Sequence, residues 1–375
     1  MTLQRLLQPI SVALFVVREA REVIRQCRRM AFVGDIWPVH PSASEVEGYR
    51  CYKSVEQRPS SPDASFIGVN RHITIDIVRS LSKKGAGGAV CYASGFSEVQ
   101  DGAVLNEALV QSAGEMPILG PNCYGVINYL DGALLWPDQH GGQRVDRGVA
   151  LLTQSSNIGI NLTMQSRALP IAYLVALGNQ AQTDLAGVLE TLVEDDRVTA
   201  IGLYIEGFPD IQALAQAMDR ARERCLPVVA VKSGVSAQGA NITRSHTASM
   251  AGSDEAASAL FERLGIARVQ DLDTLIESLK LLHVHGPLKG NRLCSMSCSG
   301  GEASLMADTA LGRDVVFPEL TPEQHDTVAK TVHELVSVSN PLDYHTFAWN
   351  KEEDLFATYS AMLACGFDLS MLVLD

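Results

Sequence analysis

A single histidine in a loop of small and hydroxyl-bearing residues is the feature of this sequence best suited to chemistry. The apolar run Leu226–Val231 predicts a buried strand, and it is followed by Lys232-Ser233-Gly234 and then by Arg244-Ser245-His246-Thr247-Ala248. Small neighbours leave an imidazole accessible, and near neutral pH much of the ring is neutral and nucleophilic. The pattern therefore indicates a histidine that accepts and passes on a chemical group, with a loop histidine that does no chemistry as the alternative.

The composition is that of a multidomain protein without a bias toward nucleic acid or membranes. A chain of 375 residues predicts two or three domains, at roughly 100–200 residues per domain. A net charge of −13 argues against nonspecific binding to nucleic acid or to an anionic membrane. No apolar run approaches the roughly 20 residues of a membrane span, and Met1–Val17 lacks a signal-peptide cleavage site, so we expect a first strand there.

The cysteines indicate a reducing compartment and no metal site. The eight cysteines are scattered without paired spacing, as is typical of reduced intracellular thiols, which predicts a cytoplasmic protein. Cys294 and Cys298 are close together, but no second Cys or His pair follows at zinc-finger spacing.

Short apolar runs alternate with longer amphipathic segments along the chain, which is typical of βα units around parallel sheets. We predict an α/β fold with three domains, residues 1–140, 141–286 and 287–375. The apolar run Leu369–Leu374 at the end of the sequence indicates a truncated third domain. The predicted strands are Ser11–Val17, Ala31–Val39, Ala64–Val69, Gly88–Tyr92, Pro117–Leu119, Val149–Thr153, Ile171–Ala176, Ala200–Tyr204, Pro227–Val231 and Arg292–Ser297.

Short motifs in a fixed order extend over nearly the whole chain. They are Trp37-Pro38-Val39-His40-Pro41, Ser94-Gly95-Phe96-Ser97-Glu98, Gly120-Pro121-Asn122-Cys123-Tyr124-Gly125-Val126, Thr153-Gln154-Ser155-Ser156-Asn157, Tyr204-Ile205-Glu206-Gly207, Lys232-Ser233-Gly234, Ser245-His246-Thr247 and Ser339-Asn340-Pro341-Leu342-Asp343. In this ordered set the chain resembles the NDP-forming acyl-CoA synthetase superfamily, which includes ADP-forming acetyl-CoA synthetase and the alpha subunit of succinyl-CoA synthetase.

The resemblance implies a CoA-binding Rossmann-like domain, a flavodoxin-like domain with a phosphorylated histidine, and part of a second flavodoxin-like domain. In this family a phosphoryl group passes from the nucleotide to the histidine and then to the acid, and the CoA thiol attacks the resulting acyl phosphate. His246 matches the phosphohistidine. Glu206 matches the carboxylate that orients it, a role that suits an acid at a strand end, although a solvated or capping acid is the alternative.

Two loops are candidates to hold the phosphoryl group. Gln154, Ser155, Ser156 and Asn157 follow a predicted strand and open a helix, whose N-terminal N–H groups attract anions. Relatives commonly have Gly where Ser156 stands. The second loop contains Asn122, Cys123 and Gly125, and we also assign Thr247, beside His246, to the phosphate site. Cys123 is not expected to be a nucleophile.

The first domain departs from the family where CoA phosphates would approach the backbone. Relatives have a glycine-containing turn after the first strand, whereas Phe15–Val23 here contains no glycine. Arg18, Arg21, Arg25 and Arg28 recur at helical spacing and could meet phosphates, or could form a solvated charged face. The CoA-binding candidates are Arg18, Pro41, Asn70, Arg71, Ser94, Gly95 and Phe96.

Two functions follow as hypotheses. The first is the CoA-binding and phosphohistidine portion of an ADP-forming acid-CoA ligase, which acts on a small carboxylic acid. It would need ATP/ADP and Mg²⁺ through an ATP-grasp domain or subunit not recognisable in this sequence, and we expect an oligomer. The second is a divergent, non-catalytic synthetase-like protein that binds CoA or a partner. A dehydrogenase is disfavoured because no G-x-G-x-x-G follows the first strand.

Overall fold

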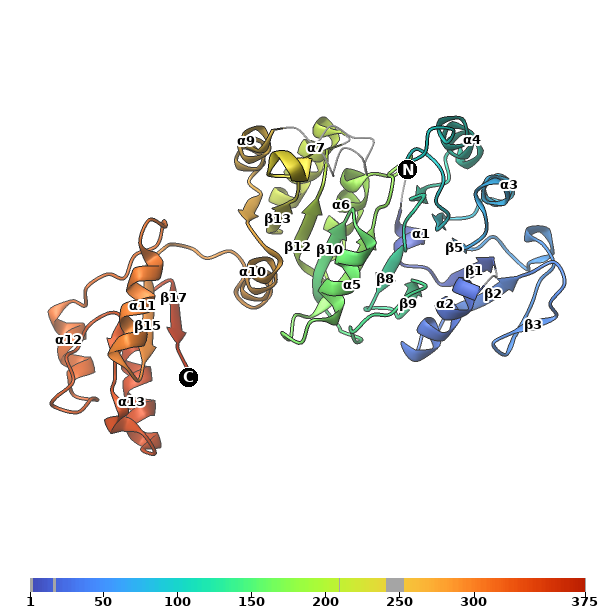
Figure 1. The fold of residues 1–375 in the computed structure, drawn as a ribbon. Helices are drawn as coiled ribbons and strands as arrows, with labels where there is room; N and C mark the ends of the chain where they lie inside the picture. The colour runs from blue at the N-terminus through green and yellow to red at the C-terminus, as the bar shows by residue number, and fades with distance from the viewer. Residues whose placement is uncertain (1–2, 16–17, 209, 241–252, 375) are drawn as a thin grey trace. The chain divides into compact units, whose positions relative to one another are not determined.

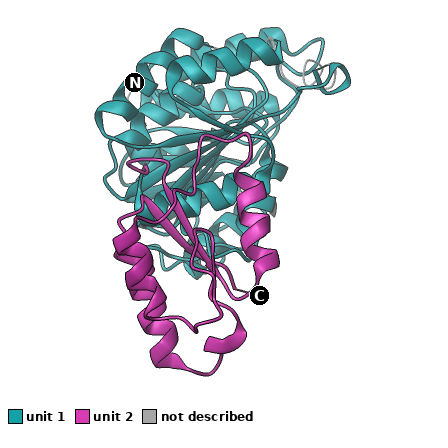
Figure 2. Ribbon diagram, turned by 90° about the vertical axis from the view of Figure 1, so that its left-hand side faces the viewer, with its two compact units in different colours: residues 1–286 teal, residues 287–375 magenta. Residues whose placement is uncertain are grey.

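The computed structural model of the protein describes residues 3–15, 18–208, 210–240 and 253–374. The chain divides into two compact units, Met1–Gly286 and Pro287–Asp375 (Figure 2). Each unit has a sheet or sheets covered by helices (Figure 1). The predicted α/β fold class with parallel sheets is therefore confirmed.

Unit 1 begins with a five-stranded parallel sheet in the order β2-β1-β5-β6-β7. Counted along the chain this is the doubly wound order 2-1-3-4-5, in which the connections change side between β1 and β5. The strands are β1 Ser11–Phe15, β2 Asp35–Val39, β5 Ala64–Ile67, β6 Ala89–Cys91 and β7 Ile118–Leu119. The accompanying helices and small elements are α1 Gln4–Leu7, α2 Arg18–Arg29, hairpin β3 Glu45–Val46 and β4 Tyr49–Arg50, the 3-10 turn η1 Val55–Gln57, α3 Arg71–Lys83 and α4 Ala103–Ala113.

The predicted strand Ala31–Val39 is shorter in the structure. Residues 31–34 complete the end of α2 instead, where Ala31 has a positive φ of 51° and Phe32 N donates to Cys27 O at 2.9 Å. The strand pattern was misleading here because the apolar residues that end a helix and those that begin a strand are continuous in sequence.

The second sheet of unit 1 has seven strands in the order β14-β13-β12-β10-β11-β8-β9. Its five parallel strands again follow the 2-1-3-4-5 order, with the change of side between β10 and β12. The strands are β8 Val126–Asn128, β9 Ala133–Leu135, β10 Gly148–Thr153, β11 Ile171–Ala176, β12 Val198–Ile205, β13 Val228–Lys232 and β14 Ala267–Val269. The helices are α5 Ser156–Met164, α6 Leu185–Val193, α7 Ile211–Glu223, α9 Asp254–Leu264 and α10 Leu272–His285.

The chain changes sheets before the predicted domain boundary at residue 140. Strand β8 pairs antiparallel with β11, and Asn128 lies opposite Tyr173. One apolar core contains both Leu14 of the first sheet and Leu174 of the second. The two sheets thus share a core, and the division into domains 1–140 and 141–286 stays a prediction.

Unit 2 repeats the same start of a doubly wound fold. Its parallel sheet has the order β16-β15-β17, which is 2-1-3 along the chain. The elements are β15 Leu293–Ser297, α11 Gly300–Ala310, α12 Pro322–Ala329, β16 Leu342–Asp343, η2 Thr346–Ala348, α13 Glu352–Leu363 and β17 Leu369–Leu372. In either unit, no described helix has both the length and the apolar character required to cross a membrane.

Candidate functional site

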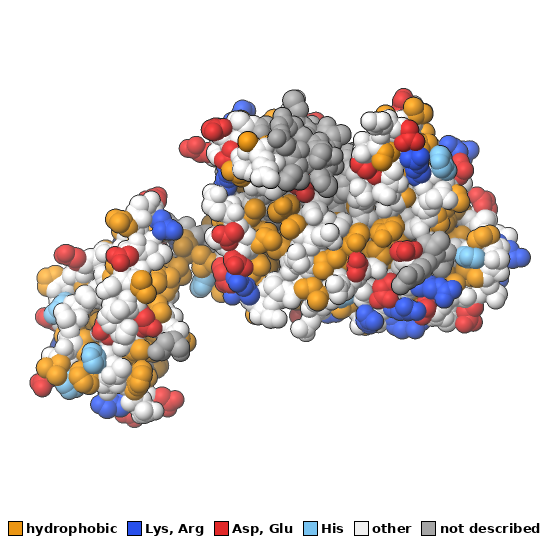
Figure 3. Space-filling model, in the orientation of Figure 1, with side chains coloured by type: hydrophobic (Ala, Val, Ile, Leu, Met, Phe, Trp, Pro, Cys, Tyr) orange, Lys and Arg blue, Asp and Glu red, His pale blue; other side chains and the backbone are white. Residues whose placement is uncertain are grey.

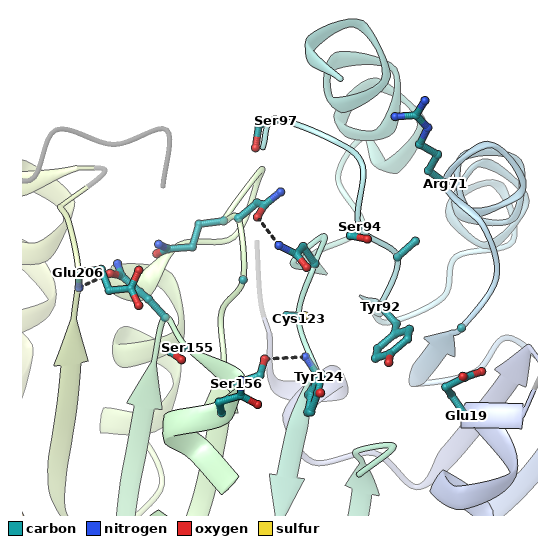
Figure 4. Close-up of a pocket in the computed structure, with 18 of the residues that line it drawn as sticks. Glu19, Arg71, Tyr92, Ser94, Ser97, Cys123, Tyr124, Ser155, Ser156 and Glu206 are labelled. Carbon is teal, nitrogen blue, oxygen red and sulfur yellow. Dashed lines mark hydrogen bonds between the residues drawn. The ribbon is translucent and has the colours of Figure 1, made fainter. Parts of the chain in front are cut away.

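A cavity of about 1010 Å³ lies in unit 1 where the carboxyl ends of both sheets meet (Figure 4). Every segment that lines the cavity follows a strand. The strands concerned include β1 and β5 of the first sheet and β10 and β12 of the second. These are the strand pairs at which each sheet changes side, the position where ligands bind doubly wound folds. The lining residues are Glu19, Gly68, Val69, Asn70, Arg71, Tyr92, Ala93, Ser94, Ser97, Asn122, Cys123, Tyr124, Gln154, Ser155, Ser156, Asn157, Gly178, Asn179, Gln180, Glu206 and Phe208.

The N-terminus of α5 faces this cavity. Ser155 caps the helix, with its Oγ accepting from Ile158 N at 3.5 Å, and its own N–H donates to Thr153 Oγ1 at 3.0 Å. The N–H groups of Ser156 and Asn157 lie in the first turn, where helix geometry provides no acceptor. The Ser156 hydroxyl accepts from Tyr124 N at 3.2 Å (Figure 4). Serine in place of glycine is therefore compatible with the helix start and adds a link to the neighbouring loop.

Gln154 has a different place from the one that the sequence suggested. It is 8% exposed, and its side-chain oxygen accepts from Glu206 N at 2.5 Å and from Gly207 N at 2.9 Å. Its side-chain nitrogen donates to Gly207 O at 2.8 Å, and its backbone N–H donates to Tyr204 O at 3.3 Å. Because these groups already bind protein, Gln154 fixes the turn that carries Glu206 rather than presenting a free oxygen or backbone N–H to a phosphate.

Glu206 follows β12 and points into the cavity from the side of the second sheet (Figure 4). The adjacent strand β13 ends at Lys232, which is 6% exposed. Burial lowers the pKa of Lys232, while the nearby Asp254 and Glu206 carboxylates oppose that effect. His246 and Thr247 lie outside the described residues, so the pairing of Glu206 with His246 stays a prediction.

The loop of Asn122, Cys123 and Gly125 connects the two sheets. Asn122 has a positive φ of 58°, its N–H donates to Ala93 O at 2.9 Å, and its side-chain nitrogen lies 3.4 Å from Asn179 Oδ1. Cys123 is 1% exposed, and burial raises the pKa of its thiol, which agrees with its not being a nucleophile. Gly125 does not line the cavity; its φ is 112°, and a Cβ there would lie 2.8 Å from Val90 Cγ1, so its role is conformational.

The CoA candidates are divided between two cavities. Asn70, Arg71 and Ser94 line the large one, whereas Pro41 lines a second cavity of about 430 Å³ together with Lys53. Val69 lines both cavities. The structure therefore does not bring Pro41 into the same cavity as the other candidates.

The turns that carry these candidates are held by the protein itself. Asn70 caps α3 by accepting from Ile73 N at 3.1 Å. Arg71 donates to Gly95 O at 2.6 Å and pairs with Asp101 at 3.2 Å. Gly95 has a φ of 93°, and Phe96 is fully buried, so its ring packs in the core and does not face the cavity.

The arginine row predicted for the first domain lies on α2, which Arg18 begins. Arg21, Arg25 and Arg28 are exposed, and Lys and Arg side chains gather over this helix (Figure 3). Arg25 pairs with Glu47 of the β3–β4 turn at 2.9 Å, and Arg28 donates to Glu47 O. Glu19 of the same helix lines the large cavity, so the start of α2 presents a carboxylate to it (Figure 4).

Sequence reasoning missed several residues of the cavity. Tyr92 and Tyr124 form an aromatic wall with ring centroids 5.9 Å apart, and burial raises the pKa of both phenols. Asn179 contributes a side chain from the loop after β11. A usable signal was present, since Tyr92 ends a predicted strand and Tyr124 and Asn179 follow predicted strands.

The structure was searched for side chains that could bind a metal ion. Within the described ranges, no group of three or more His, Cys, Asp or Glu is placed to hold a metal ion.

Comparisons with known proteins find two domain families and several similar ligases. Residues 16–129 match the CoA binding domain, and residues 146–282 match the succinyl-CoA ligase like flavodoxin domain. The alpha subunit of acetate–CoA ligase (ADP-forming) II from Pyrococcus furiosus is 28% identical over 338 residues, which are 88% of this chain and 72% of that subunit. Acetate–CoA ligase (ADP-forming) from Methanocaldococcus jannaschii is 27% identical over 83% of this chain but only 44% of its own length. A trans-feruloyl-CoA synthase of an unknown prokaryote is 27% identical over 96% of this chain and 53% of its own length.

The fold comparison agrees. The apo structure of the dinucleotide forming acetyl-coenzyme A synthetase 1 from Ca. Korarchaeum cryptofilum superposes with a TM-score of 0.86 at 23% identity, covering 100% of this chain and 90% of that one. The predicted CoA-binding and flavodoxin-like domain types are thus confirmed, and the chain spans about half the length of the single-chain relatives cited here. The resemblance to the NDP-forming (ADP-forming) acyl-CoA synthetase superfamily that the sequence predicts is thus confirmed.

Proposed function

We propose that this chain is the CoA-binding and phosphohistidine portion of an ADP-forming acid-CoA ligase, which converts a carboxylic acid, CoA and ATP to acyl-CoA, ADP and phosphate. The observation that carries the proposal is the shared cavity. It joins turns of the CoA-binding domain, Asn70 to Ser94, to the α5 N-terminus and Glu206 of the flavodoxin-like domain. The phosphoryl group passes from the histidine to the acid, and the CoA thiol then displaces phosphate from the acyl phosphate, so histidine, acid and thiol must all reach one site.

The described residues have defined roles in this proposal. The first-turn N–H groups of Ser156 and Asn157 stabilise the phosphoryl group without a buried cation. The backbone N–H of Glu206 donates to Gln154, which fixes the turn, and the Glu206 carboxylate accepts a hydrogen bond from one ring nitrogen of His246, so that the other nitrogen is free to attack phosphorus. The N–P bond of His246 then breaks as an oxygen of the acid takes the phosphoryl group.

The turns of the first sheet offer some of the groups that CoA binding needs. The first turn of α3 offers the N–H groups of Arg71 and His72 for phosphate, while the second cavity supplies a largely apolar wall with Lys53 at its edge. CoA, when bound, supplies the thiol nucleophile. We assign Asn70, Arg71 and Ser94 to the large cavity, and Pro41 and Lys53 to the small one. Gly95 lines neither cavity, because its backbone N–H donates to Glu98 and its carbonyl oxygen accepts from Arg71.

We further propose that nucleotide and Mg²⁺ act through an ATP-grasp partner domain or subunit. The relative from Pyrococcus furiosus is a subunit alpha, and the single-chain relatives are about twice the length matched here. A cytoplasmic location is supported by the free state of all eight cysteines, seven of which are buried.

The experiment is acid-labile phosphate analysis by intact mass. The complete gene product, or this chain with its ATP-grasp partner, is incubated with ATP and Mg²⁺, and His246→Ala is compared with a matched exposed-histidine control, His325→Ala. Labile phosphate in the wild type and in the control, but not in His246→Ala, supports the proposal. A folded wild type without labile phosphate would refute it.

One observation favours the alternative of a non-catalytic binding protein. Glu19 lines the cavity after β1, where relatives have a glycine turn and where a carboxylate repels a diphosphate. Calorimetric titration with CoA separates the two functions. Phosphorylation of His246 without measurable CoA binding would favour a phosphorelay or scaffold.

A further inference from the structure

The two halves of the cavity are tied together by one carboxylate outside the predicted site. The side chain of Glu98 accepts hydrogen bonds from three donors in two loops. Oε1 accepts from Gly95 N, and Oε2 accepts from Phe96 N at 3.1 Å. Oε2 also accepts from the side-chain nitrogen of Asn179 at 2.5 Å, across 81 residues of sequence.

The contact continues from Asn179 into the loop that joins the two sheets. Asn179 N donates to Pro121 O at 2.9 Å, and Asn179 Oδ1 lies 3.4 Å from the side-chain nitrogen of Asn122. Asn122 N in turn donates to Ala93 O at 2.9 Å, which returns the chain of contacts to the turn after β6. The result is a closed ring of hydrogen bonds among three cavity loops, 93–98, 120–125 and 177–182.

We propose that Glu98 is a positioning residue that fixes the 93–98 turn, which carries Ser94 and Gly95, against the Asn179 loop, so that the thiol and the acyl phosphate meet at a fixed separation. The proposal rests on the proposed function, which assigns CoA to the turns of the first sheet and the phosphoryl group to the α5 N-terminus. Glu98 itself touches neither reactant and acts through Gly95, Phe96 and Asn179.

A carboxylate suits this joint better than an amide. Two oxygens accept from three N–H donors, whereas glutamine would turn its own NH₂ group toward one of those donors and lose that bond. Burial raises the pKa of Glu98, but the hydrogen bonds from the backbone and from Asn179 outweigh it and hold the pKa below its usual range. The charged, acceptor-only form is thus the one that the surrounding N–H groups select.

The test compares Glu98→Gln and Glu98→Ala with the matched control Glu107→Gln, an exposed glutamate on α4 whose only described bond is to Gln111 one turn away. All variants are made in the complete gene product, or in this chain with its ATP-grasp partner. Four quantities are measured: labile phosphate on His246, kcat, KM for CoA, and the calorimetric Kd for CoA. Thermal unfolding checks that each variant is folded.

Labile phosphate should form at the wild-type level in Glu98→Gln, because the α5 N-terminus and Glu206 are untouched. Transfer to CoA should fall roughly 10- to 100-fold in kcat, the effect of a misplacement of about 1 Å. The Kd for CoA should rise about tenfold, which corresponds to one lost hydrogen bond at the turn. The control should match the wild type in all four quantities, and Glu98→Ala should be at least as impaired as Glu98→Gln.

The outcomes separate this inference from the proposed function. A wild type that phosphorylates His246, with Glu98→Gln equal to it in kcat and in Kd for CoA, overturns the role of Glu98 alone. Absence of phosphate on the wild type refutes the proposed function, and an unchanged Kd for CoA in Glu98→Gln would then also overturn the inference. Loss of phosphorylation in Glu98→Gln would show a general structural role and overturn it as well.

Discussion

Replacement of Gly178 by alanine should loosen the contact between the cavity loops. Gly178 follows β11 and has a φ of 58°. A Cβ at this position would lie 2.7 Å from both Asn122 O and Cys123 Cβ, and closer still to Pro121 O. Backbone atoms form two of these three contacts, so no side-chain rotation can relieve them. The loop with Asn122 and Cys123 must therefore move away from the loop after β11.

The expected cost has two parts. The left-handed backbone costs a non-glycine residue about 1–2 kcal/mol. Overlap in a close-packed region adds roughly 1–3 kcal/mol. Gly265 isolates the first part, because its φ is 71° and a Cβ there would meet nothing within 4 Å. Gly178→Ala should therefore destabilise unit 1 by about 1–3 kcal/mol more than Gly265→Ala.

The assay is urea unfolding followed by tryptophan fluorescence. A Trp349→Phe background removes the one tryptophan of unit 2 and leaves Trp37 and Trp136 to report on unit 1. Free energies come from linear extrapolation at a common slope. Equal destabilisation by the two glycine substitutions would show that the loops do not approach each other as closely as the structure has them, and would refute the reasoning.

Three further predictions concern buried polar groups in unit 1. Burial lowers the pKa of Arg58 to about 10, and none of its guanidinium nitrogens has a hydrogen-bond partner among the described residues. Arg58→Met should therefore raise the free energy of unfolding by about 1–3 kcal/mol in urea titrations. A lower free energy of unfolding would instead reveal an anionic partner of Arg58. Gln154→Ala frees the turn of Glu206 and should slow labile phosphate formation about tenfold at unchanged Kd for CoA, and a normal rate would exclude the positioning role. Burial also lowers the pKa of His140, whose Nδ1 lies 2.8 Å from the Tyr129 hydroxyl. The unfolded chain therefore binds a proton at a higher pH than the folded chain, and the free energy of unfolding should fall as the pH drops below about 6.5. His140→Gln should make this fall smaller. The same pH dependence in His140→Gln and the wild type would contradict the prediction.

Much of the fold and the location of the cavity could be predicted from the sequence, because both depend on local patterns. Apolar runs such as Val149–Thr153 and Ile171–Ala176 are strands in the structure with nearly the predicted bounds. In a parallel sheet the carboxyl ends of such strands share one edge, so motifs that follow them converge. Asn70, Ser94, Asn122, Ser156 and Glu206 all come after such strands, and all line one cavity.

The partners of these residues could not be predicted, because hydrogen bonds across long sequence separations leave no local signature. Gln154 was assigned to phosphate on its position alone, and only the structure shows that its amide is taken up by Glu206 and Gly207, 52 and 53 residues away. Glu98 was visible as part of a motif, but its contact with Asn179 depends on how two sheets meet. The place of Pro41 in the small cavity also depends on how distant segments pack, which the sequence does not show.

The loop from Gly120 to Gly125 explains why one cavity can serve two sheets. It leaves the first sheet at β7 and enters the second at β8, which is hydrogen-bonded to β11. Both of its ends are therefore fixed in ladders of different sheets, and a relative rotation of the sheets would have to strain the six residues between them. Asn122 and Cys123 lie at the centre of this loop, bonded to the turn after β6 and packed on the turn after β11. In the proposed reaction an acyl group moves from a phosphate held at one sheet to a thiol held at the other. The central residues of that reaction need to lie in a loop that is fixed to both sheets, so that neither sheet moves without them.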